Sequence, residues 1–295
     1  MSLPPANWDV FLDDACVLCL LFEEGEGDTA HDLSRFRNDG TVYGATWVGT
    51  PYGRGLEFDG IDDYVEVPDG PAFDWEDELT IEAVIKPRSW GESEYGRIAQ
   101  KGGEFEFYVR GHGDNNLGFW VYVTEGFDHV ESYKNTVRLG EWHHVVGVYD
   151  GSGLRIFVNG EPASGVTSLT GAVRNTTSVL TIASRTGADR WFDGTIALVR
   201  IYNRALSADE IRALYQNYRY GLACYKLIGQ VINPLISDTY ERVELIRKIQ
   251  TNRWKIENNQ LVIYDDDGVT PLKVFNLKDK YGNPSEVNVY EREPV

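Results

Sequence analysis

The sequence predicts a mainly β protein in which a large antiparallel sandwich precedes a short helix and a small β-meander. Its 30 glycines and its aromatic fraction of 13% are typical of short strands joined by tight turns, rather than of a helical bundle. With 295 residues, 42% of them hydrophobic, the chain can bury a large core. Its character changes after Gly221, which predicts a domain over 1–220, a linker with a short helix over 221–250, and a meander over 251–295.

The strands of the sandwich are predicted from alternating apolar and polar residues and from the turns between them. Leu79–Pro87 alternates at period two and ends at a proline. Asp150–Gly153 contains two glycines, which permit the positive φ of a hairpin turn. The predicted strands cover residues 17–22, 79–87, 96–100, 104–110, 117–124, 130–133, 141–149, 154–160, 178–184 and 194–202.

The elements after the sandwich have their own signals. Ser207–Glu210 is a capping box that starts a helix running to about Tyr218. Tyr240–Ile249 reads as a short amphipathic helix. Three strands over 254–257, 261–264 and 272–275 are then joined by turn-rich segments. A meander of this size buries little by itself, so we expect it to dock on another surface or to drive oligomerisation.

Three segments together resemble the laminin-G-like domain. They are Gly55–Val67, Phe192–Ser207 and the predicted hairpin Glu141–Gly160, and the resemblance covers about residues 10–220. It implies the concanavalin A-like jelly roll. Proteins of this family mostly bind or assemble and less often catalyse, so the resemblance implies a non-enzymatic role. The fold itself does not specify the partner.

The C-terminal segment resembles a recurrent part of tailed-phage structural proteins. The residues that carry this resemblance are Asn252-Arg253, Tyr264–Gly268, Leu277–Asp279 and Gly282–Pro284. It implies a virion component that contacts other virion proteins. The amino terminus fits this, because it lacks the basic and apolar regions of a secretory signal and predicts synthesis in the host cytoplasm.

Charge and hydrophobicity argue against two kinds of partner, and the cysteine spacing argues against a disulfide. The net charge of -18 would repel phosphate backbones, which argues against nucleic acid, and no apolar run is long enough to insert into a membrane. Cys16 and Cys19 are three apart in Ala15–Phe22, which reads as a strand, so we expect them on opposite faces and not joined by a disulfide.

Calcium is the cofactor that the family resemblance implies, as a structural ion. Its ligands would be the carboxylates of Asp32, Asp59, Asp62 and Asp63. The alternative is that these side chains cap turns or face solvent. The sequence favours this alternative at one point, because Ala197-Leu198 stands where the family usually has an acidic pair.

Aromatic residues on strands and adjoining loops are candidates for stacking on sugar rings. We assign a glycan-binding role to Trp90, Trp120, Tyr122 and Trp191, with Trp120 and Tyr122 on one face of a strand. The alternative is that these rings fill the core or an oligomer interface.

Evidence for catalysis is weak. Glu104 and Glu106 are two apart on a predicted strand and would share a face, as glycosidase carboxylates do, but no third carboxylate follows at Tyr108. His143 and His144 are adjacent and cannot bind one metal together, and we expect Trp142 inside with one histidine hydrogen-bonded.

These observations predict a virion structural protein, in the capsid, tail or fibre, that displays the jelly roll and forms a homo-oligomer. The alternative is a lectin that recognises a host-surface glycan. A polysaccharide hydrolase or lyase is the third hypothesis.

Overall fold

The computed structural model describes residues 14–51, 53–216, 254–257, 260–264 and 271–276. The chain divides into two compact units, one over residues 12–216 and one that contains the three C-terminal strands. Among the described residues, none of the helices has the length and apolar character needed to cross a bilayer.

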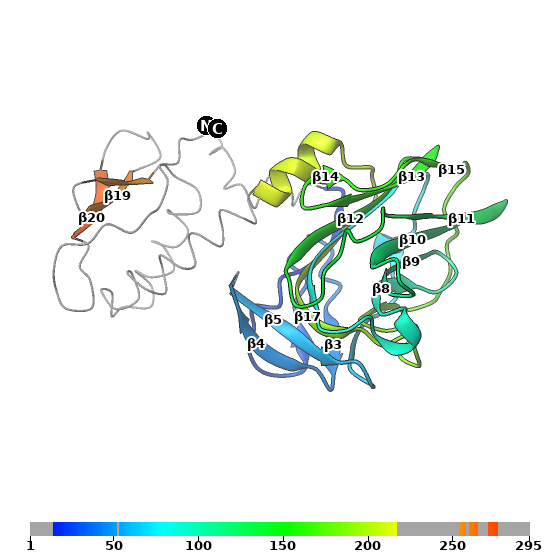
Figure 1. Ribbon diagram of the computed structural model, residues 1–295, viewed down its shortest axis with the longest axis horizontal. Helices are drawn as coiled ribbons and strands as arrows, with labels where there is room; N and C mark the ends of the chain where they lie inside the picture. Colours follow the sequence, from blue (N-terminus) through cyan, green and yellow to red (C-terminus); the bar gives the residue numbers. More distant parts are fainter. Residues whose placement is uncertain (1–13, 52, 217–253, 258–259, 265–270, 277–295) are drawn as a thin grey trace. The chain divides into compact units, whose positions relative to one another are not determined.

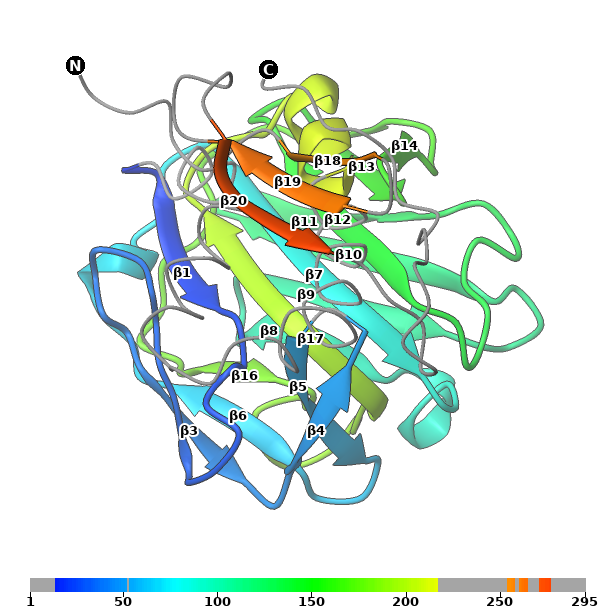
Figure 2. The same cartoon turned by 90° about the vertical axis from the view of Figure 1, so that its left-hand side faces the viewer.

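The first unit is a sandwich of two antiparallel sheets (Figure 1). One sheet has nine strands in the order β14-β13-β12-β7-β17-β5-β4, with β1 beside β17 and β15 beside β13. Figure 2 looks onto this sheet, with β17, β7 and β12 running side by side. Its strands are β1 (Cys16–Leu20), β4 (Thr46–Thr50), β5 (Gly53–Asp59), β7 (Leu79–Pro87), β12 (His143–Tyr149), β13 (Gly153–Val158), β14 (Glu161–Pro162), β15 (Thr167–Ser168) and β17 (Asp193–Tyr202).

The other sheet has eight strands in the order β11-β10-β9-β8-β16-β6-β3-β2. They are β2 (Thr29–Ala30), β3 (Gly40–Tyr43), β6 (Tyr64–Val67), β8 (Arg97–Lys101), β9 (Phe105–Arg110), β10 (Asn116–Val123), β11 (Gly126–Glu131) and β16 (Leu180–Ile182). The predicted antiparallel jelly-roll sandwich is therefore confirmed.

The core lies between the sheets and is built from alternate residues of each strand. Phe105, Phe107 and Val109 of β9 are fully buried in it, as are Ile81 and Ile85 of β7. Each such side chain contributes about 2–3 kcal/mol through burial. The intervening residues of β9 face outward, and this alternation positions the site described below.

Strand bounds follow the predictions closely, with one displacement. β7 has the predicted bounds, whereas the strand predicted over 130–133 is β11, Gly126–Glu131. Val123 pairs with Gly126, so β10 and β11 are joined by a two-residue turn and the second strand begins at once.

The helix and the meander are also formed. Ser207 Oγ accepts a hydrogen bond from Glu210 N (3.3 Å) and Ser207 N donates to Glu210 Oε2 (2.8 Å), which is the predicted capping box, and a helix over 208–216 follows. β18 (Trp254–Glu257), β19 (Gln260–Tyr264) and β20 (Pro271–Asn276) form an antiparallel three-stranded sheet. The linker and helix predicted over 221–250 lie outside the described residues.

Cys16 and Cys19 are not joined by a disulfide, as predicted, but the reasoning about faces was wrong. The register of β1 shifts between Cys16 and Leu18, which places both thiols away from the core while Val17, Leu18 and Leu20 point into it. Burial raises the pKa of Cys19 to about 11, so this thiol is unreactive.

Candidate functional site

The outer face of the eight-stranded sheet carries a cluster of rings over β9, β10 and β11. Their inward neighbours belong to the core, so these side chains point away from it. Trp120 of β10 lies directly between Glu106 of β9 and His129 of β11, and Tyr122 lies opposite Phe127. We call the following group the aromatic face: Tyr108, Trp120, Tyr122, Phe127 and His129.

The rings of the aromatic face stack on one another. Trp120 lies 4.4 Å from His129 between ring centroids, at an interplanar angle of 11°, and 5.5 Å from Phe127 at 24°. Tyr122 lies 5.4 Å from Phe127. Trp120, Tyr122 and His129 are half-buried, but Phe127 is 56% exposed. A ligand can therefore reach the array at Phe127, and flat rings of this kind stack well on sugar rings.

Tyr108 orients Trp120 from beneath. The Trp120 Nε1–H donates to the Tyr108 hydroxyl at 2.8 Å, and burial raises the pKa of Tyr108 to about 12, so the hydroxyl stays neutral. The Tyr108 ring crosses Gly118, where a Cβ would lie 2.1 Å from Tyr108 Cζ. Only glycine leaves room there, and the indole position depends on it.

A charged group adjoins the rings on β8 and β9. Arg97 donates to the carboxylate of Glu106 and to Gln100 Oε1 (3.2 Å), and its guanidinium lies 4.6 Å from the Tyr108 ring centroid. The Tyr122 hydroxyl donates to Glu106 Oε1 at 3.2 Å. Burial lowers the pKa of Arg97, against the opposing pull of Glu106. Arg97 and Gln100 are buried, so Glu106, which is 16% exposed, is the group of these three that a sugar hydroxyl could reach.

Two of the four predicted glycan-binding residues belong to the aromatic face and two do not. Trp120 and Tyr122 share it, as expected from their spacing. Trp90 packs against the core and near Gly111, whose Cβ would lie 2.8 Å from Trp90 Cγ. Trp191 lies 5.9 Å from Tyr64 in a separate ring contact. Both residues lie in loops, so strand periodicity could not place them.

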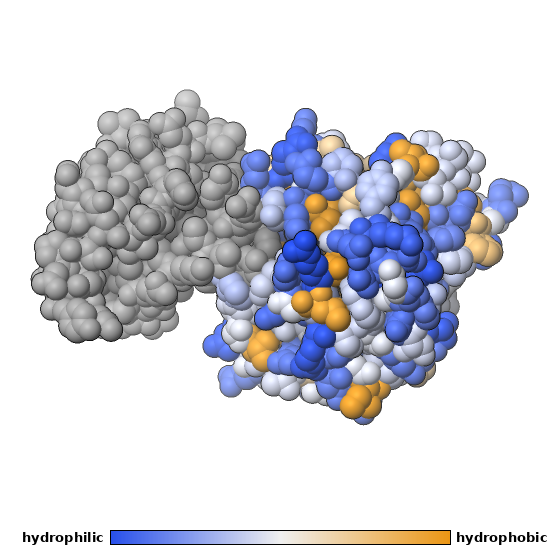
Figure 3. Space-filling view, viewed as in Figure 1, coloured by the Kyte–Doolittle hydropathy of each residue, from blue (hydrophilic) through white to orange (hydrophobic). Residues whose placement is uncertain are grey.

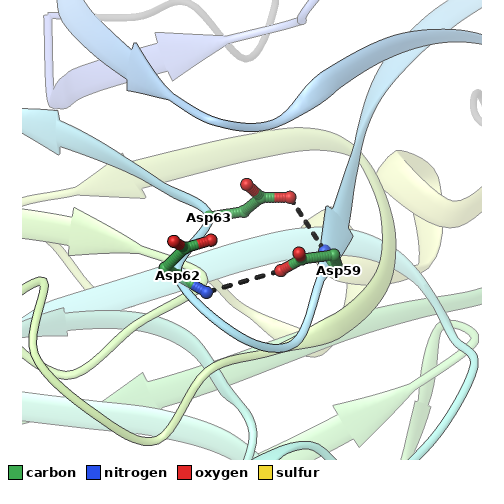
Figure 4. Close-up of side chains that lie close together, drawn as sticks. All are labelled: Asp59, Asp62 and Asp63. Atoms are coloured by element: carbon green, nitrogen blue, oxygen red, sulfur yellow. Dashed lines mark hydrogen bonds between the residues drawn. The ribbon is translucent and has the colours of Figure 1, made fainter.

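Three of the four predicted calcium ligands converge in the turn between β5 and β6 (Figure 4). Oxygens of Asp59, Asp62 and Asp63 lie within 4.8 Å of one another. Asp59 Oδ1 accepts from the backbone of Ile61 (2.8 Å), and Asp63 Oδ2 accepts from Asp59 N (2.9 Å). Burial raises the pKa of Asp63, with Asp59 and Asp62 acting in the same direction. Carboxylates suit Ca²⁺ chemically, but turn formation already uses them, and calcium stays a prediction.

Asp32 is not part of this cluster. It is fully buried, and its two oxygens accept hydrogen bonds from Cys19 N (2.8 Å), Ser34 N (2.8 Å) and Asn38 N (2.7 Å). Its carboxylate organises the 32–38 loop instead of facing a shared cation site.

The expectation that Glu104 and Glu106 share one face of a strand is wrong. Glu104 lies in the turn before β9, is fully buried, and receives hydrogen bonds from Lys101, Trp75 and Thr176. Glu106 lies on the outer face with Arg97. The two carboxylates therefore cannot flank one bond in the way a glycosidase requires.

The nine-stranded sheet carries a closed charge network on its own outer face. Glu82 accepts from Arg200 Nη1 (3.3 Å) and the Tyr202 hydroxyl (3.4 Å), and lies 3.0 Å from His144 Nε2. Burial alone would raise the pKa of Glu82, but these neighbours outweigh it and lower the pKa. His143 Nε2 accepts from Arg138 N at 3.0 Å, so both histidines are bonded. Trp142 was expected inside and is only half-buried, because it precedes the strand.

Sequence reasoning assigned no role to His129 or Arg97, and it considered Phe127 as a stacking ring without including it among the four assigned residues. The signal was present in the β10–β11 hairpin, because a turn at Thr124-Glu125 pairs Trp120 with His129 and Tyr122 with Phe127. The misplaced start of the second strand hid this pairing. Figure 3 shows that hydrophobic residues on the visible coloured surface lie in small groups among hydrophilic ones.

The two-sheet sandwich and a family match together define the class of protein. The chain belongs to the concanavalin A-like lectin/glucanases superfamily, whose family description matches residues 59–212, just over half of the chain. A search of curated protein sequences finds no match.

Solved structures share this fold at low sequence identity. The binding domain of Paraclostridial Mosquitocidal Protein 1 has 17% identity and a TM-score of 0.57, covering 70% of this chain and 53% of its own. Domain 4 of AbnA, a GH43 arabinanase from Geobacillus stearothermophilus, was solved in complex with arabinotriose. It has 16% identity and a TM-score of 0.54, and the match covers 68% of this chain and 98% of its own. The binding domain of Botulinum Neurotoxin DC in complex with SialylT has 16% identity and a TM-score of 0.54, and the match covers 71% of this chain and 53% of its own. The chain thus spans about half the length of the toxin domains.

Proposed function

We propose that the jelly roll is a carbohydrate-binding module that holds a glycan on the aromatic face. The observation that carries this proposal is the stacked array of Trp120, Tyr122, Phe127 and His129 on one outward sheet surface, with the Glu106 carboxylate beside it. Rings supply apolar faces for sugar C–H groups, and the adjacent polar groups bind hydroxyls.

The neighbours in fold support this proposal. The arabinanase domain was solved with arabinotriose and a toxin binding domain with SialylT, and the arabinanase domain matches over nearly its whole length. A domain of this fold can therefore hold a sugar. The virion role predicted from residues 251–295 stays a prediction, because the family match ends at residue 212.

We further propose that binding occurs without turnover. Glu106 is the outward carboxylate on β9, and it is already engaged by Arg97 and by the Tyr122 hydroxyl. Glu104, its proposed partner in hydrolysis, is buried elsewhere. An acid and a nucleophile flanking one glycosidic bond are not formed by this pair.

The test is titration of a glycan panel by calorimetry with the wild type and two variants. Phe127→Ala removes the most exposed ring of the array, and we expect at least about a tenfold loss of affinity at little cost in stability. Tyr133→Ala is the matched control, since Tyr133 is 61% exposed and lies outside the aromatic face. Equal affinity in all three proteins, or no saturable binding by the wild type, would contradict the proposal.

A further inference from the structure

Arg190 is an unusual cation in a chain with a net charge of -18. Among the described residues, no carboxylate lies within ion-pair distance of its guanidinium, whereas its neighbours Arg97 and Arg185 pair with Glu106 and Asp189. The guanidinium lies over the Tyr95 ring, 5.0 Å from the centroid. Its fork of N–H donors is half-exposed and available for an anion.

The backbone holds Arg190 in a costly conformation. Its φ is 57°, its N–H donates to the Glu92 carboxylate, and its carbonyl accepts from Arg97 N at 2.9 Å. It lies where three loops meet, and these loops contain most of the described left-handed residues other than glycine. They are Ser93, Glu94, His112, Asn115, Ala183, Thr186 and Arg190. Strain of this kind is retained where the surrounding structure fixes it, and it clusters at binding sites.

A chain of contacts joins Arg190 to the aromatic face. The Arg190 guanidinium lies over the Tyr95 ring, and the centroid of that ring is 5.7 Å from the centroid of the Tyr108 ring. The Tyr108 hydroxyl receives the Trp120 Nε1–H. A short oligosaccharide with one ring on the aromatic face could therefore reach Arg190 with a neighbouring sugar.

Arg190 lies among other charged side chains at this end of the sheet: Arg97 and Arg185 pair with Glu106 and Asp189, and the Glu92 carboxylate accepts the Arg190 backbone N–H. Burial lowers the pKa of Arg97, and the nearby charges of Arg185 and Arg190 act in the same direction, so three guanidinium groups are close enough to repel one another. Interactions beyond about 8 Å are screened at physiological ionic strength, so the net charge of the whole chain acts weakly here.

We infer that Arg190 binds the carboxylate or sulfate group of an anionic sugar whose neighbouring ring lies on the aromatic face. This inference rests on the proposed function and names its substrate class. A planar oxyanion would accept two N–H groups from the guanidinium while the opposite side of the guanidinium stays on Tyr95.

The experiment uses matched pairs of glycans that differ only in charge. They are an oligogalacturonide with its methyl ester, and chondroitin sulfate oligosaccharides with their desulfated form. The full-length protein is titrated with each member at two ionic strengths. We expect the anionic member to bind at least about tenfold more tightly, and more tightly still at low salt. The preferred pair tells whether the recognised group is a carboxylate or a sulfate.

Three variants complete the test. Arg190→Gln removes the charge without changing the backbone requirement, and should abolish the preference for the anionic member. Arg190→Lys keeps the charge but loses the paired N–H donors of the guanidinium, and should retain part of the preference for the anionic member. Arg212→Gln is the matched control, because this arginine is exposed on the helix beside the other sheet and pairs with Glu161. Unfolding curves confirm that each variant is folded.

The experiment distinguishes failure of the anionic assignment from failure of the proposed glycan binding. If both members of every pair bind alike, if Arg190→Gln matches the wild type, and if Phe127→Ala still weakens binding, the anionic assignment is overturned and glycan binding stands. If no member binds, the proposed function fails and the inference fails with it.

Discussion

The two outer faces of the sandwich each hold a glutamate against an arginine, and they differ in their access to water. Glu82 and Arg200 on the nine-stranded sheet have side chains that are 2% and 5% exposed, with His144 and Tyr202 completing the network. Glu106 on the eight-stranded sheet is 16% exposed and lies beside the half-buried rings of Trp120 and Tyr122, whereas its partner Arg97, at 6%, is as buried as Arg200. The same pair of residue types therefore stands in two different environments.

The difference separates a structural network from a binding surface. A buried ion pair contributes little net stability, but loss of one partner leaves the other charge uncompensated in a medium of low dielectric constant. In the pair on the eight-stranded sheet the arginine is buried as well, and the more exposed Glu106 carboxylate is the group that a ligand could reach. The Glu82 network thus fixes the packing on one sheet, and the Glu106 group lies where a sugar could reach it.

Glu82→Gln should have the largest effect on stability. The amide retains an acceptor, but the buried charge of Arg200 loses its counterion, so we expect a loss of about 3–5 kcal/mol in the free energy of unfolding. Chemical denaturation measures it. Glycan affinity of the folded fraction should not change, and a loss below about 1 kcal/mol would show that water reaches this network.

Gly118→Ala tests the support beneath the aromatic face. The new Cβ would collide with Tyr108, whose ring must move and release the Trp120 Nε1–H, at a cost of about 2 kcal/mol. We expect the variant to fold with a shifted tryptophan fluorescence maximum and weaker glycan binding. Wild-type fluorescence and affinity would mean that Tyr108 does not position Trp120.

Sequence periodicity predicted the sandwich well and the site only in part. Alternation of side chains at period two predicted the bounds of β7 correctly, and the same rule placed Trp120 and Tyr122 on one face of their strand. The rule failed wherever a residue is inserted, because a shift of one position moves a side chain to the other face. The bulge after Cys16 and the turn that contains Glu104 are such places.

Loops were beyond the reach of this rule for another reason. Trp90, Trp191 and Arg190 are positioned by hydrogen bonds between segments far apart in the chain, such as Gly96 N to Trp90 O (2.8 Å) and Glu92 N to Trp191 O (3.0 Å). No local pattern contains that information, so one sequence alone could not place these residues beside one another.

Asp150→Asn tests a carboxylate in a hairpin, away from either arginine–glutamate group. Burial alone would raise the pKa of Asp150, but hydrogen bonds from Arg155 and Ser152 outweigh it and lower the pKa to about 2. Stabilisation by this carboxylate is complete above pH 4 and is lost as the pH falls towards 2, and we expect it to be about 1–2 kcal/mol. Thermal melts from pH 2 to 7 should show a smaller acid-induced drop in the variant. Parallel curves would contradict this.

Glu106→Gln is the matched counterpart of Glu82→Gln and should have the smallest effect on stability, about 1 kcal/mol, because Glu106 is 16% exposed and the new amide oxygen still accepts from Arg97. Arg97 is buried, with its side chain 6% exposed, but it keeps hydrogen bonds to Gln100 Oε1 (3.2 Å) and the Tyr95 carbonyl (3.4 Å). The comparison between the faces depends on the ratio of the two losses, measured in one buffer by chemical denaturation. If Glu106→Gln costs as much as Glu82→Gln, the eight-stranded face is as closed as the other, and access of a glycan to it would require the rings to move.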